Sequence, residues 1–237
     1  MPQLTIGEIA VEVVRKDIKN LHLGVYPPNG RVRIAAPMRI DDDAVRLFAI
    51  SKLTWIKKQQ VRFRQQERQA KREYVSGESH YYNGKRYILK VITAPPPSRV
   101  EIRGKKYIYL YVPAGSSREK RQQVMNQWYR NRLKEQIPGL LEEWQPITGV
   151  EVSSWGIKAM KTKWGSCNVR EGRIWINLEL AKKPTHCIRY ILVHEMVHLL
   201  ERRHNDRFIA YMDRYMPQWR KYKEELNRVI LGHVDWN

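Results

Sequence analysis

The chain has 237 residues, which is enough for one large domain or two small ones with a hydrophobic core in each. Its 44 lysines and arginines exceed its 24 aspartates and glutamates, and the net charge of +20 favours polyanionic partners such as nucleic acid, nucleotides or an acidic membrane face. Two cysteines, Cys167 and Cys187, are too few for a disulfide framework or for a structural zinc site made of cysteines.

The front of the chain is rich in predicted strands. Residues 4–14 and 20–35 alternate apolar and charged side chains, with the period of two that is typical of strands. The sequence Pro-Pro-Asn-Gly at residues 27–30 predicts a turn inside the second stretch. A long helix is then expected from residue 41 to about residue 72, and three aspartates at its start would interact favourably with the helix dipole.

This long helix carries a run of basic residues interleaved with Trp55 and Phe63. We interpret the run as a solvated helix face whose aromatic side chains point into the core. The alternative is a surface for single-stranded nucleic acid, in which Lys57, Lys58 and Arg62 contact phosphates while the aromatic rings stack on bases. The basic residues of the run are Lys52, Lys57, Lys58, Arg62, Arg64, Arg68, Lys71 and Arg72.

Further strands and then helices follow the long helix. Asn83-Gly84 predicts a hairpin between two tyrosine-rich strands, and the prolines at 95–97 precede another strand at 107–112. From Ser116 the pattern becomes helical. The predicted elements of this part are a helix at 116–144, strands at 150–161 and 173–180, a helix from Pro184, and helices at 206–216 and 217–231.

These elements predict an α+β fold with two regions. Residues 1–115 form a β-rich, basic N-terminal region with one long helix, and residues 116–237 form a helix-dominated C-terminal region. We identify no internal repeat and no low-complexity segment. Residues 1–10 lack the pattern of a signal peptide, and no apolar stretch of about twenty residues is present, so we expect a cytoplasmic protein without a membrane span.

The most informative motif is His-Glu-Met-Val-His at residues 194–198. Residues four apart share one helix face, so His194 and His198 can bind one metal ion together. Glu195 follows the first ligand, and its carboxylate can accept a proton from a metal-bound water without binding the metal. The alternative is that these are two histidines on a helix face that bind no metal. However, the surrounding apolar residues predict a buried helix, and polar side chains buried there need a binding partner such as a metal ion. The motif predicts a metal-dependent hydrolase.

Two residues compete for the place of third ligand. Glu201 lies on the same helical row, but seven residues of continuous helix would carry it about 10 Å along the axis from His194. His204 follows after the chain can turn back, and we expect it to be the third ligand rather than a plain surface histidine. The spacing equals that of metzincins, but Glu201 replaces their glycine and no separate Met-turn follows, so the motif does not predict a metzincin.

Several further motifs accompany the histidines in a fixed order. Residues 161–167 are Lys-Thr-Lys-Trp-Gly-Ser-Cys, and residues 172–177 are Gly-Arg-Ile-Trp-Ile-Asn. Pro184, the motif at 194–198 and His204 follow. This order resembles the YgjP-like metallopeptidase family, a relative of the WLM and SprT-like zinc peptidases. The agreement covers residues 150–210 closely, and the basic, β-rich front half is similar to that of the family as well.

The resemblance implies a zincin-like C-terminal region with a short antiparallel sheet and one zinc ion on His194, His198 and His204, with Glu195 as general base. It also places the Trp-Gly-Ser-Cys strand beside the metal, where zincins pair an edge strand with an extended substrate backbone. The substrate-binding residues implied there are Lys163, Trp164, Gly165 and Ser166, of which Lys163 replaces the usual arginine of the family. Three histidines and a water fill a tetrahedral site, so we expect Cys167 to pack near the metal without binding it.

Three functions remain open at this point. Hydrolysis of an unfolded peptide is the function that the family name implies, and a single three-histidine zinc site suits attack on a carbonyl. Proteins similar to this one have also been assigned nucleoside-triphosphate pyrophosphatase activity, notably on UTP, and the positive charge suits a triphosphate. The third is a basic nucleic-acid-binding protein with a structural zinc, against which Glu195 argues because a structural site needs no base.

Overall fold

The computed structural model describes residues 3–26, 29–65, 72–160 and 163–228. It divides into two compact units, Met1–Arg68 and Gln69–Asn237, which are described separately below as unit 1 and unit 2. The boundary expected between residues 115 and 116 lies inside unit 2, and as a domain division it stays a prediction. Within the described residues, no helix has the length and apolar character needed to cross a membrane.

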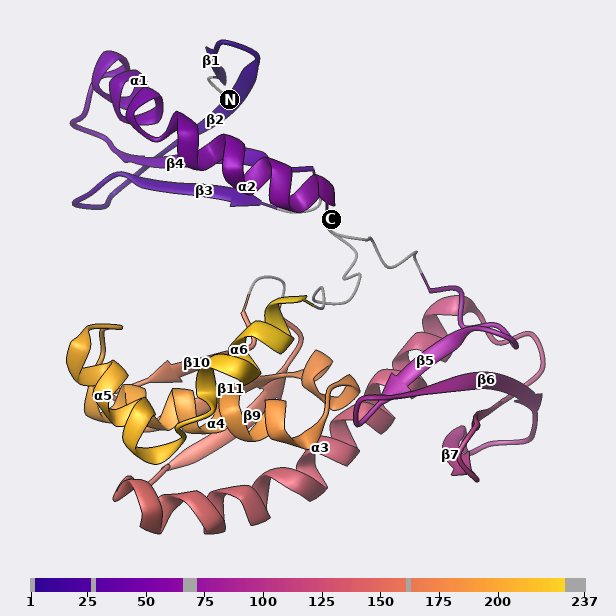
Figure 1. Cartoon of the computed structure of the whole chain (residues 1–237). Helices are drawn as coiled ribbons and strands as arrows, with labels where there is room; N and C mark the ends of the chain where they lie inside the picture. The colour runs from indigo at the N-terminus through magenta and orange to yellow at the C-terminus, as the bar shows by residue number, and fades with distance from the viewer. Residues whose placement is uncertain (1–2, 27–28, 66–71, 161–162, 229–237) are drawn as a thin grey trace. The chain divides into compact units, whose positions relative to one another are not determined.

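Unit 1 is a four-stranded sheet with two helices on one face (Figure 1). The strand order is β1-β2-β4-β3, in which β2 and β4 are parallel and the two outer pairs are antiparallel. Apolar residues at every second position of β2 and β4 form its core with the buried side of the helices. The elements are β1 (Gln3–Ile6), β2 (Ile9–Lys16), β3 (His22–Tyr26), β4 (Arg31–Pro37), α1 (Asp42–Ser51) and α2 (Leu53–Gln65).

Two elements of unit 1 differ from their predicted form. The strand expected at residues 4–14 is a hairpin, because Gly7 adopts a φ of 57° and turns the chain between β1 and β2. The long helix is interrupted at Lys52, whose N–H bonds to the Ala49 carbonyl at 3.1 Å, a tighter i→i−3 turn that ends α1. Asp41 caps α1 by accepting from the Ala44 N–H at 2.6 Å, and Asp42 and Asp43 lie in its first turn, as expected of acidic residues at the start of the helix.

The aromatic residues of the basic helix were expected in the core. This is wrong for Trp55, which is 43% exposed, while Ile56 takes the fully buried position on α2. Lys57 and Lys58 are exposed as expected. The side chains of Arg62, Phe63 and Arg64 lie outside the described residues, as do Arg68 and Lys71.

Unit 2 contains a second four-stranded sheet, a three-stranded sheet and four α-helices within the described residues. The long helix α3 (Arg118–Thr148) contacts both sheets and ends at Gly149, whose φ of 67° closes the helix in the left-handed conformation. The remaining elements are β5 (Ser79–Tyr82), β6 (Lys85–Thr93), β7 (Arg99–Arg103), β8 (Tyr107–Val112), β9 (Ser154–Lys158), β10 (Gly165–Asn168), β11 (Arg173–Asn177), the 3₁₀ helix η1 (Leu178–Lys182), α4 (Thr185–Leu200), α5 (Asp206–Tyr215) and α6 (Trp219–Arg228).

The α+β class expected from the sequence is confirmed, with two differences in detail. β10 and β11 are antiparallel as expected, but β9 pairs with β11 in parallel, so the small sheet is mixed. Helix α3 continues beyond the expected end at Trp144, through Pro146 to Thr148, whose side chain is buried and donates to the Trp144 carbonyl at 2.8 Å. Packing of a buried face outweighs the cost of proline inside a helix.

The two four-stranded sheets have the same topology, which the sequence did not suggest. The order β5-β6-β8-β7 repeats β1-β2-β4-β3, including the parallel central pair, and a helix follows the last strand in both. Four of the five corresponding elements are displaced by 76 residues, since β1, β2, β4 and α1 begin at residues 3, 9, 31 and 42, and β5, β6, β8 and α3 begin at 79, 85, 107 and 118. The fifth pair, β3 and β7, begins at residues 22 and 99 and is displaced by 77. The expectation of no internal repeat is therefore wrong at the level of structure.

The hairpin predicted at Asn83-Gly84 joins β5 to β6 and contacts the beginning of α4. Both residues have positive φ, 48° and 74°, as a type I′ turn requires. The Asn83 and Gly84 N–H groups donate to the carbonyls of Ala181 and Lys182 in η1, at 3.0 and 3.2 Å. The Thr185 hydroxyl donates to the Asn83 side chain at 2.9 Å. The turn thereby fixes the N-terminal end of α4 relative to the four-stranded sheet.

We predict that Gly84→Ala destabilises the protein more than Gly104→Ala. Both glycines have positive φ, 74° and 65°, so each substitution introduces backbone strain of about 1–2 kcal/mol. A Cβ atom at residue 84 would also lie 2.6 Å from Cγ of Pro184, whereas residue 104 has open space. Urea unfolding of the two variants measures the difference, and equal losses would contradict the contact between the turn and α4.

Candidate metal centre and active site

Helix α4 lies at the centre of unit 2 and carries the histidine motif. It contacts α3, α5 and α6 as well as β10 and β11. Most of its apolar residues are less than 2% exposed, including Leu192, Val193 and Met196. The side chains around the motif are thus held by packing on several sides, and the direction in which His194 and His198 point is fixed by the core.

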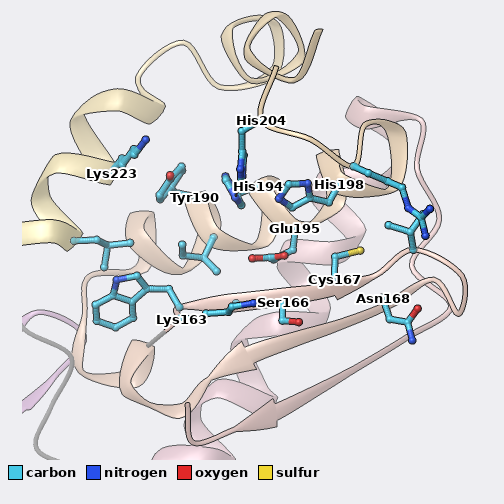
Figure 2. Close-up of a pocket in the computed structure, with 16 residues that line it drawn as sticks. Lys163, Ser166, Cys167, Asn168, Tyr190, His194, Glu195, His198, His204 and Lys223 are labelled. Carbon is cyan, nitrogen blue, oxygen red and sulfur yellow. Dashed lines mark hydrogen bonds between the residues drawn. The ribbon is translucent and has the colours of Figure 1, made fainter. Parts of the chain in front are cut away.

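Three histidines converge beside this helix, as Figure 2 shows. His194 and His198 come from α4, and His204 comes from the segment between α4 and α5. Nε2 of His194 lies 3.1 Å from Nε2 of His204, and one donor atom from each of the three rings lies within 4.8 Å of the others. The structure brings together the three residues that the spacing had predicted as ligands, while their role as ligands stays a prediction.

The surroundings hold these rings in place. Nδ1 of His198 donates to the carbonyl of Glu201 at 3.1 Å, which leaves the lone pair of Nε2 free. The Phe208 ring packs against all three imidazoles, with centroid distances of 4.7–4.9 Å. Phe208 is placed by the start of α5, where its N–H donates to the side chain of Asn205 at 3.0 Å.

The donor set fits a metal ion such as zinc. A tetrahedral zinc ion with bonds of about 2.0–2.1 Å separates two donors by about 3.3–3.4 Å, close to the distance between the Nε2 atoms of His194 and His204. Burial, together with the neighbouring His198 and His204, lowers the pKa of His194 to about 3. Burial also lowers the pKa of His198 and of His204. Low pKa values keep the rings neutral, and the neutral imidazole is the form that binds metals.

Glu201 does not join the histidines, for a reason that differs from the predicted one. Helix α4 ends at Leu200, so Glu201 is the C-cap residue with extended φ and ψ and no longer follows the helical row. Its carboxylate accepts from the N–H of Arg203 at 3.0 Å, which stabilises the turn leading to His204. Glu201 is a part of the turn that returns the chain toward His194 and His198.

The carboxylate of Glu195 is buried between α4 and β10. It is 6% exposed, and burial raises its pKa to about 8, an effect that the positive charge of Lys163 opposes. Gly165 permits the close approach of β10. A Cβ atom at residue 165 would lie 2.6 Å from Oε1 of Glu195 and 2.8 Å from Cγ2 of Ile191. Glycine at this position therefore positions the carboxylate against the strand.

Asn177 holds the segment before β10, a role that the sequence analysis did not assign. Its side chain is fully buried at the end of β11. Nδ2 donates to the carbonyls of Met160 and Lys163 at 2.9 and 2.7 Å, and its backbone N–H donates to the carbonyl of Trp164 at 2.9 Å. Its position at the end of a predicted strand was the available signal, since a buried amide there must find partners. Lys161 and Thr162 lie outside the described residues.

A cavity of about 690 Å³ lies beside the histidines and Glu195 (Figure 2). All four residues of β10 contribute to its wall, together with Lys163 and Trp164. The sequence did not indicate the contributions of Tyr190, Arg202 and Lys223, because these residues reach the cavity only through the packing of α4 and α6. Tyr190 is adjacent to His194, with ring centroids 5.9 Å apart, and burial raises its pKa to about 12.

Cys167 lies in the cavity wall, but its thiol is not among the clustered donor atoms of the three histidines. Burial and the nearby Glu195 raise its pKa to about 11, so the thiol stays protonated at neutral pH. A second group of ligand-type residues, His186, Cys187 and Glu225, joins α4 to α6 through a 2.8 Å hydrogen bond between His186 Nε2 and Glu225 Oε2. This bond helps to position α6, which carries Lys223.

Clustered imidazoles with an adjacent buried carboxylate are typical of metal-dependent hydrolases. The sequence matches the family described as "YgjP-like, metallopeptidase domain" over residues 19–229. The chain belongs to this family and is a metallopeptidase-type hydrolase.

Comparisons with curated proteins and with solved structures are less informative about the family. The search of curated proteins finds no match. Among solved structures, the chain is similar to the crystal structure of the metallopeptidase zymogen of Pyrococcus abyssi abylysin, with 20% sequence identity and a TM-score of 0.36. That likeness covers 38% of this chain and 90% of the other.

We expect His204, and not Glu201, to contribute to metal binding. His204→Ala removes a donor atom. Zinc affinity should therefore fall by more than the roughly 10- to 100-fold that is typical when a residue hydrogen-bonded to a metal ligand is removed. Glu201→Ala keeps the carbonyl that accepts from His198 and should leave affinity nearly unchanged. Competition with a chromophoric chelator measures both constants, and the reverse ranking would overturn the assignment.

We also predict that Gly165→Ala impairs both stability and activity. The added methyl group must displace either β10 or the Glu195 carboxylate, and overpacking of this kind costs about 1–3 kcal/mol. Gly139→Ala, on α3, is the matched control because the same methyl group added there meets no other atom within 4 Å. Urea unfolding and hydrolysis assays compare the two variants, and a Gly165→Ala variant as stable and active as Gly139→Ala would refute the close contact.

Proposed function

We propose that the chain is a zinc-dependent peptidase that uses Glu195 as general base on an extended, unfolded polypeptide. The observation that carries the proposal is the position of the Glu195 carboxylate, buried between the three histidines and the edge strand β10. A carboxylate in that place can act on a water at the metal and on a substrate lying along the strand. A structural metal site would need no such group.

One zinc ion per chain would be held by His194, His198 and His204. The ion would supply a Lewis acid that lowers the pKa of a water molecule and polarises a carbonyl group. The hydrogen bond from His198 Nδ1 to the Glu201 carbonyl orients that ring, and the Phe208 ring packs against all three imidazoles.

Glu195 would accept the proton of the attacking water and return it to the leaving nitrogen. Its burial favours the protonated form, whereas Lys163 and a divalent cation at the histidines favour the ionised form that a base requires. The missing side chain at Gly165 leaves the space that the carboxylate occupies beside β10. The residues of the chain thus set both the position and the charge of the base.

The substrate would bind as an added strand beside β10. In the described residues β10 is the edge of the sheet, paired with β11 on one side, and its whole length lines the cavity. An extended peptide can pair with the backbone of such an edge, largely independently of its own sequence. Lys163, Trp164, Gly165 and Ser166 would contact it, and Tyr190 and Lys223 can stabilise negative charge at the scissile carbonyl.

One observation favours a second candidate, hydrolysis of a nucleoside triphosphate such as UTP to the monophosphate and pyrophosphate. Lys163, Arg202 and Lys223 line the cavity, with Glu195 as its acidic group among the described residues. Three cations around one cavity suit a triphosphate. Phosphoanhydride cleavage more often uses Mg²⁺ held by carboxylates or paired metals, and this cavity offers three imidazoles instead.

The two candidates are separated by assaying zinc-loaded protein on denatured casein and on each nucleoside triphosphate in parallel. Casein cleavage without triphosphate hydrolysis supports the peptidase. Triphosphate hydrolysis without casein cleavage would replace it by the second candidate. The Lys223→Ala variant is assayed on both substrates as well. Removal of this cation should weaken the binding of a triphosphate more than the binding of a neutral peptide backbone.

We predict that Glu195→Gln retains zinc but loses turnover by about 10²- to 10⁴-fold, the usual contribution of a general base. The amide has the shape of the carboxylate but cannot accept the proton. Elemental analysis and hydrolysis assays on the same preparation measure both properties. A His194→Ala, His198→Ala double variant is the control that should lose zinc. A fully active Gln variant would mean that another group activates the water.

A further inference from the structure

A row of three tyrosines lies on the face of the β5-β6-β8-β7 sheet that points away from the core. Ile108 and Leu110 of β8 are fully buried, and the alternation of a strand places Tyr107, Tyr109 and Tyr111 on the opposite face. The rings form a continuous row, with centroids 6.2 Å apart for the first pair and 6.4 Å for the second.

Basic side chains from β6, from β7 and from the turn between β7 and β8 lie over this row, so that Tyr107 and Tyr109 are half-buried and Tyr111 is 8% exposed. The Arg99 guanidinium lies 4.0 Å from the centre of the Tyr111 ring, and that of Arg103 lies 5.3 Å from the centre of the Tyr109 ring. The amines of Lys90 and Lys106 lie 5.3 and 5.4 Å from the centre of the Tyr107 ring. We call these three tyrosines with Lys90, Arg99, Arg103 and Lys106 the tyrosine face.

The fold itself does not require aromatic residues at these positions. Unit 1 repeats the same strand order, and its β4 begins 76 residues before β8 (residues 31 and 107). The positions of β4 that correspond to the three tyrosines are Arg31, Arg33 and Ala35, while the core positions between them are Val and Ile in place of Ile and Leu. The central strand β4 thus carries no ring on this face, where the neighbouring β3 contributes Tyr26 opposite Arg31. The fold therefore does not require a row of three rings on its central strand, so the tyrosines point to a function beyond packing.

The cations on the tyrosine face are exposed and weakly held. The side chains of Arg99 and Arg103 are 48% and 60% exposed, and both donate to Glu101, at 2.9 and 2.8 Å. Exposed ion pairs of this kind contribute little stability, so a phosphate can compete for the guanidinium groups. Between residues 79 and 112 Glu101 is the sole acidic residue, whereas the basic residues are Lys85, Arg86, Lys90, Arg99, Arg103, Lys105 and Lys106.

We propose that the tyrosine face binds single-stranded nucleic acid, with bases stacked on Tyr107 and Tyr109 and phosphates on the surrounding lysines and arginines. Sheets that bind single strands present two or three aromatic rings on central strands, and β8 is a central strand of this sheet. The positive surface matches the charge of the backbone, and the rings match the unpaired bases. Duplex nucleic acid offers no free base faces and binds through its phosphates alone.

The site is distinct from the proposed helix surface at Lys57 and Lys58 in unit 1 and does not depend on the proposed peptidase activity. The rings of the tyrosine face belong to unit 2, which also carries the histidines. A single strand bound there would localise the hydrolase to nucleic acid and to the proteins bound to it.

The test is a fluorescence-anisotropy titration of the full chain with labelled oligothymidylate, and with its duplex with oligoadenylate, at low and physiological salt. We expect the single strand to bind more tightly than the duplex. Tyr109→Leu should weaken binding of the single strand about 5- to 100-fold, and Tyr109→Phe, which keeps the ring, should bind like the wild type. Urea unfolding and zinc content of each variant establish that it is folded.

A charge-matched pair of double variants provides the second arm. Arg99→Ala with Arg103→Ala removes two charges from the tyrosine face and should lower the salt dependence, by about 0.7 in slope for each lost phosphate contact. Lys57→Ala with Lys58→Ala removes the same charge from α2 and should change little. The proposal would be overturned if both double variants lost the same affinity for the single strand, or if the Arg99, Arg103 variant bound it as tightly as the wild type. It would also be overturned if the wild type bound duplex as tightly as single strand.

Competition with polyglutamate excludes the other class of polyanion. We expect unlabelled oligothymidylate to displace the labelled oligonucleotide at a far lower concentration of negative charges than polyglutamate does, because polyglutamate has no rings to stack. Equal displacement, with Tyr109→Leu unaffected, would assign the face to acidic polypeptides instead and overturn the proposal.

Discussion

Helix α4 buries most of its surface in unit 2 and turns the remaining strip, with His194 and His198, toward the cavity. Four further elements bring their own residues to this strip. β10 supplies Gly165, the segment after α4 supplies His204, α5 supplies Phe208 and α6 supplies Lys223. Each of these contributions depends on α4 being held in the core, because a shift of the helix would separate the histidines from all four.

The contact between Gly165 and Glu195 shows how closely the site is built. Burial of a carboxylate is costly unless its surroundings favour the charge, and the raised pKa of Glu195 expresses that cost. The compensating group within the described residues is Lys163, which lies two residues before Gly165 and is held by Asn177. One short segment therefore supplies the space, the countercharge and the edge strand, and this explains why these residues are adjacent in the sequence.

The same sheet topology is used in different ways in the two units. In unit 1 the sheet is covered by two helices and forms a core of its own, with Val13 and Ile34 at its centre. In unit 2 the same topology is joined to the helices and the small sheet of the metal centre through the Asn83-Gly84 turn and through α3. The two copies keep the apolar pattern of their inner faces and differ on their outer faces, where unit 2 has the tyrosine row.

The sequence alone determined the features that depend on local geometry. The four-residue spacing of His194 and His198 sets both on one helix face, His204 lies where the chain can turn back after that helix, and Asn83-Gly84 favours a turn with positive φ. The resemblance to a family added the segment at residues 163–166. Each of these depends on residues within a few turns of one another, so the printed order is sufficient to predict them.

Only the tertiary structure decided the features that depend on long-range packing. The parallel pairing of β9 with β11, the continuation of α3 through Pro146, and the break at Lys52 are set by which surfaces are buried together. The cations around the cavity come from α6 and from segments on either side of α4, and the repeat of the sheet is hidden because an alternating apolar pattern specifies a strand but not its partner. The physical reason is the same in each case, since side-chain packing between distant segments outweighs the local preferences that a sequence displays.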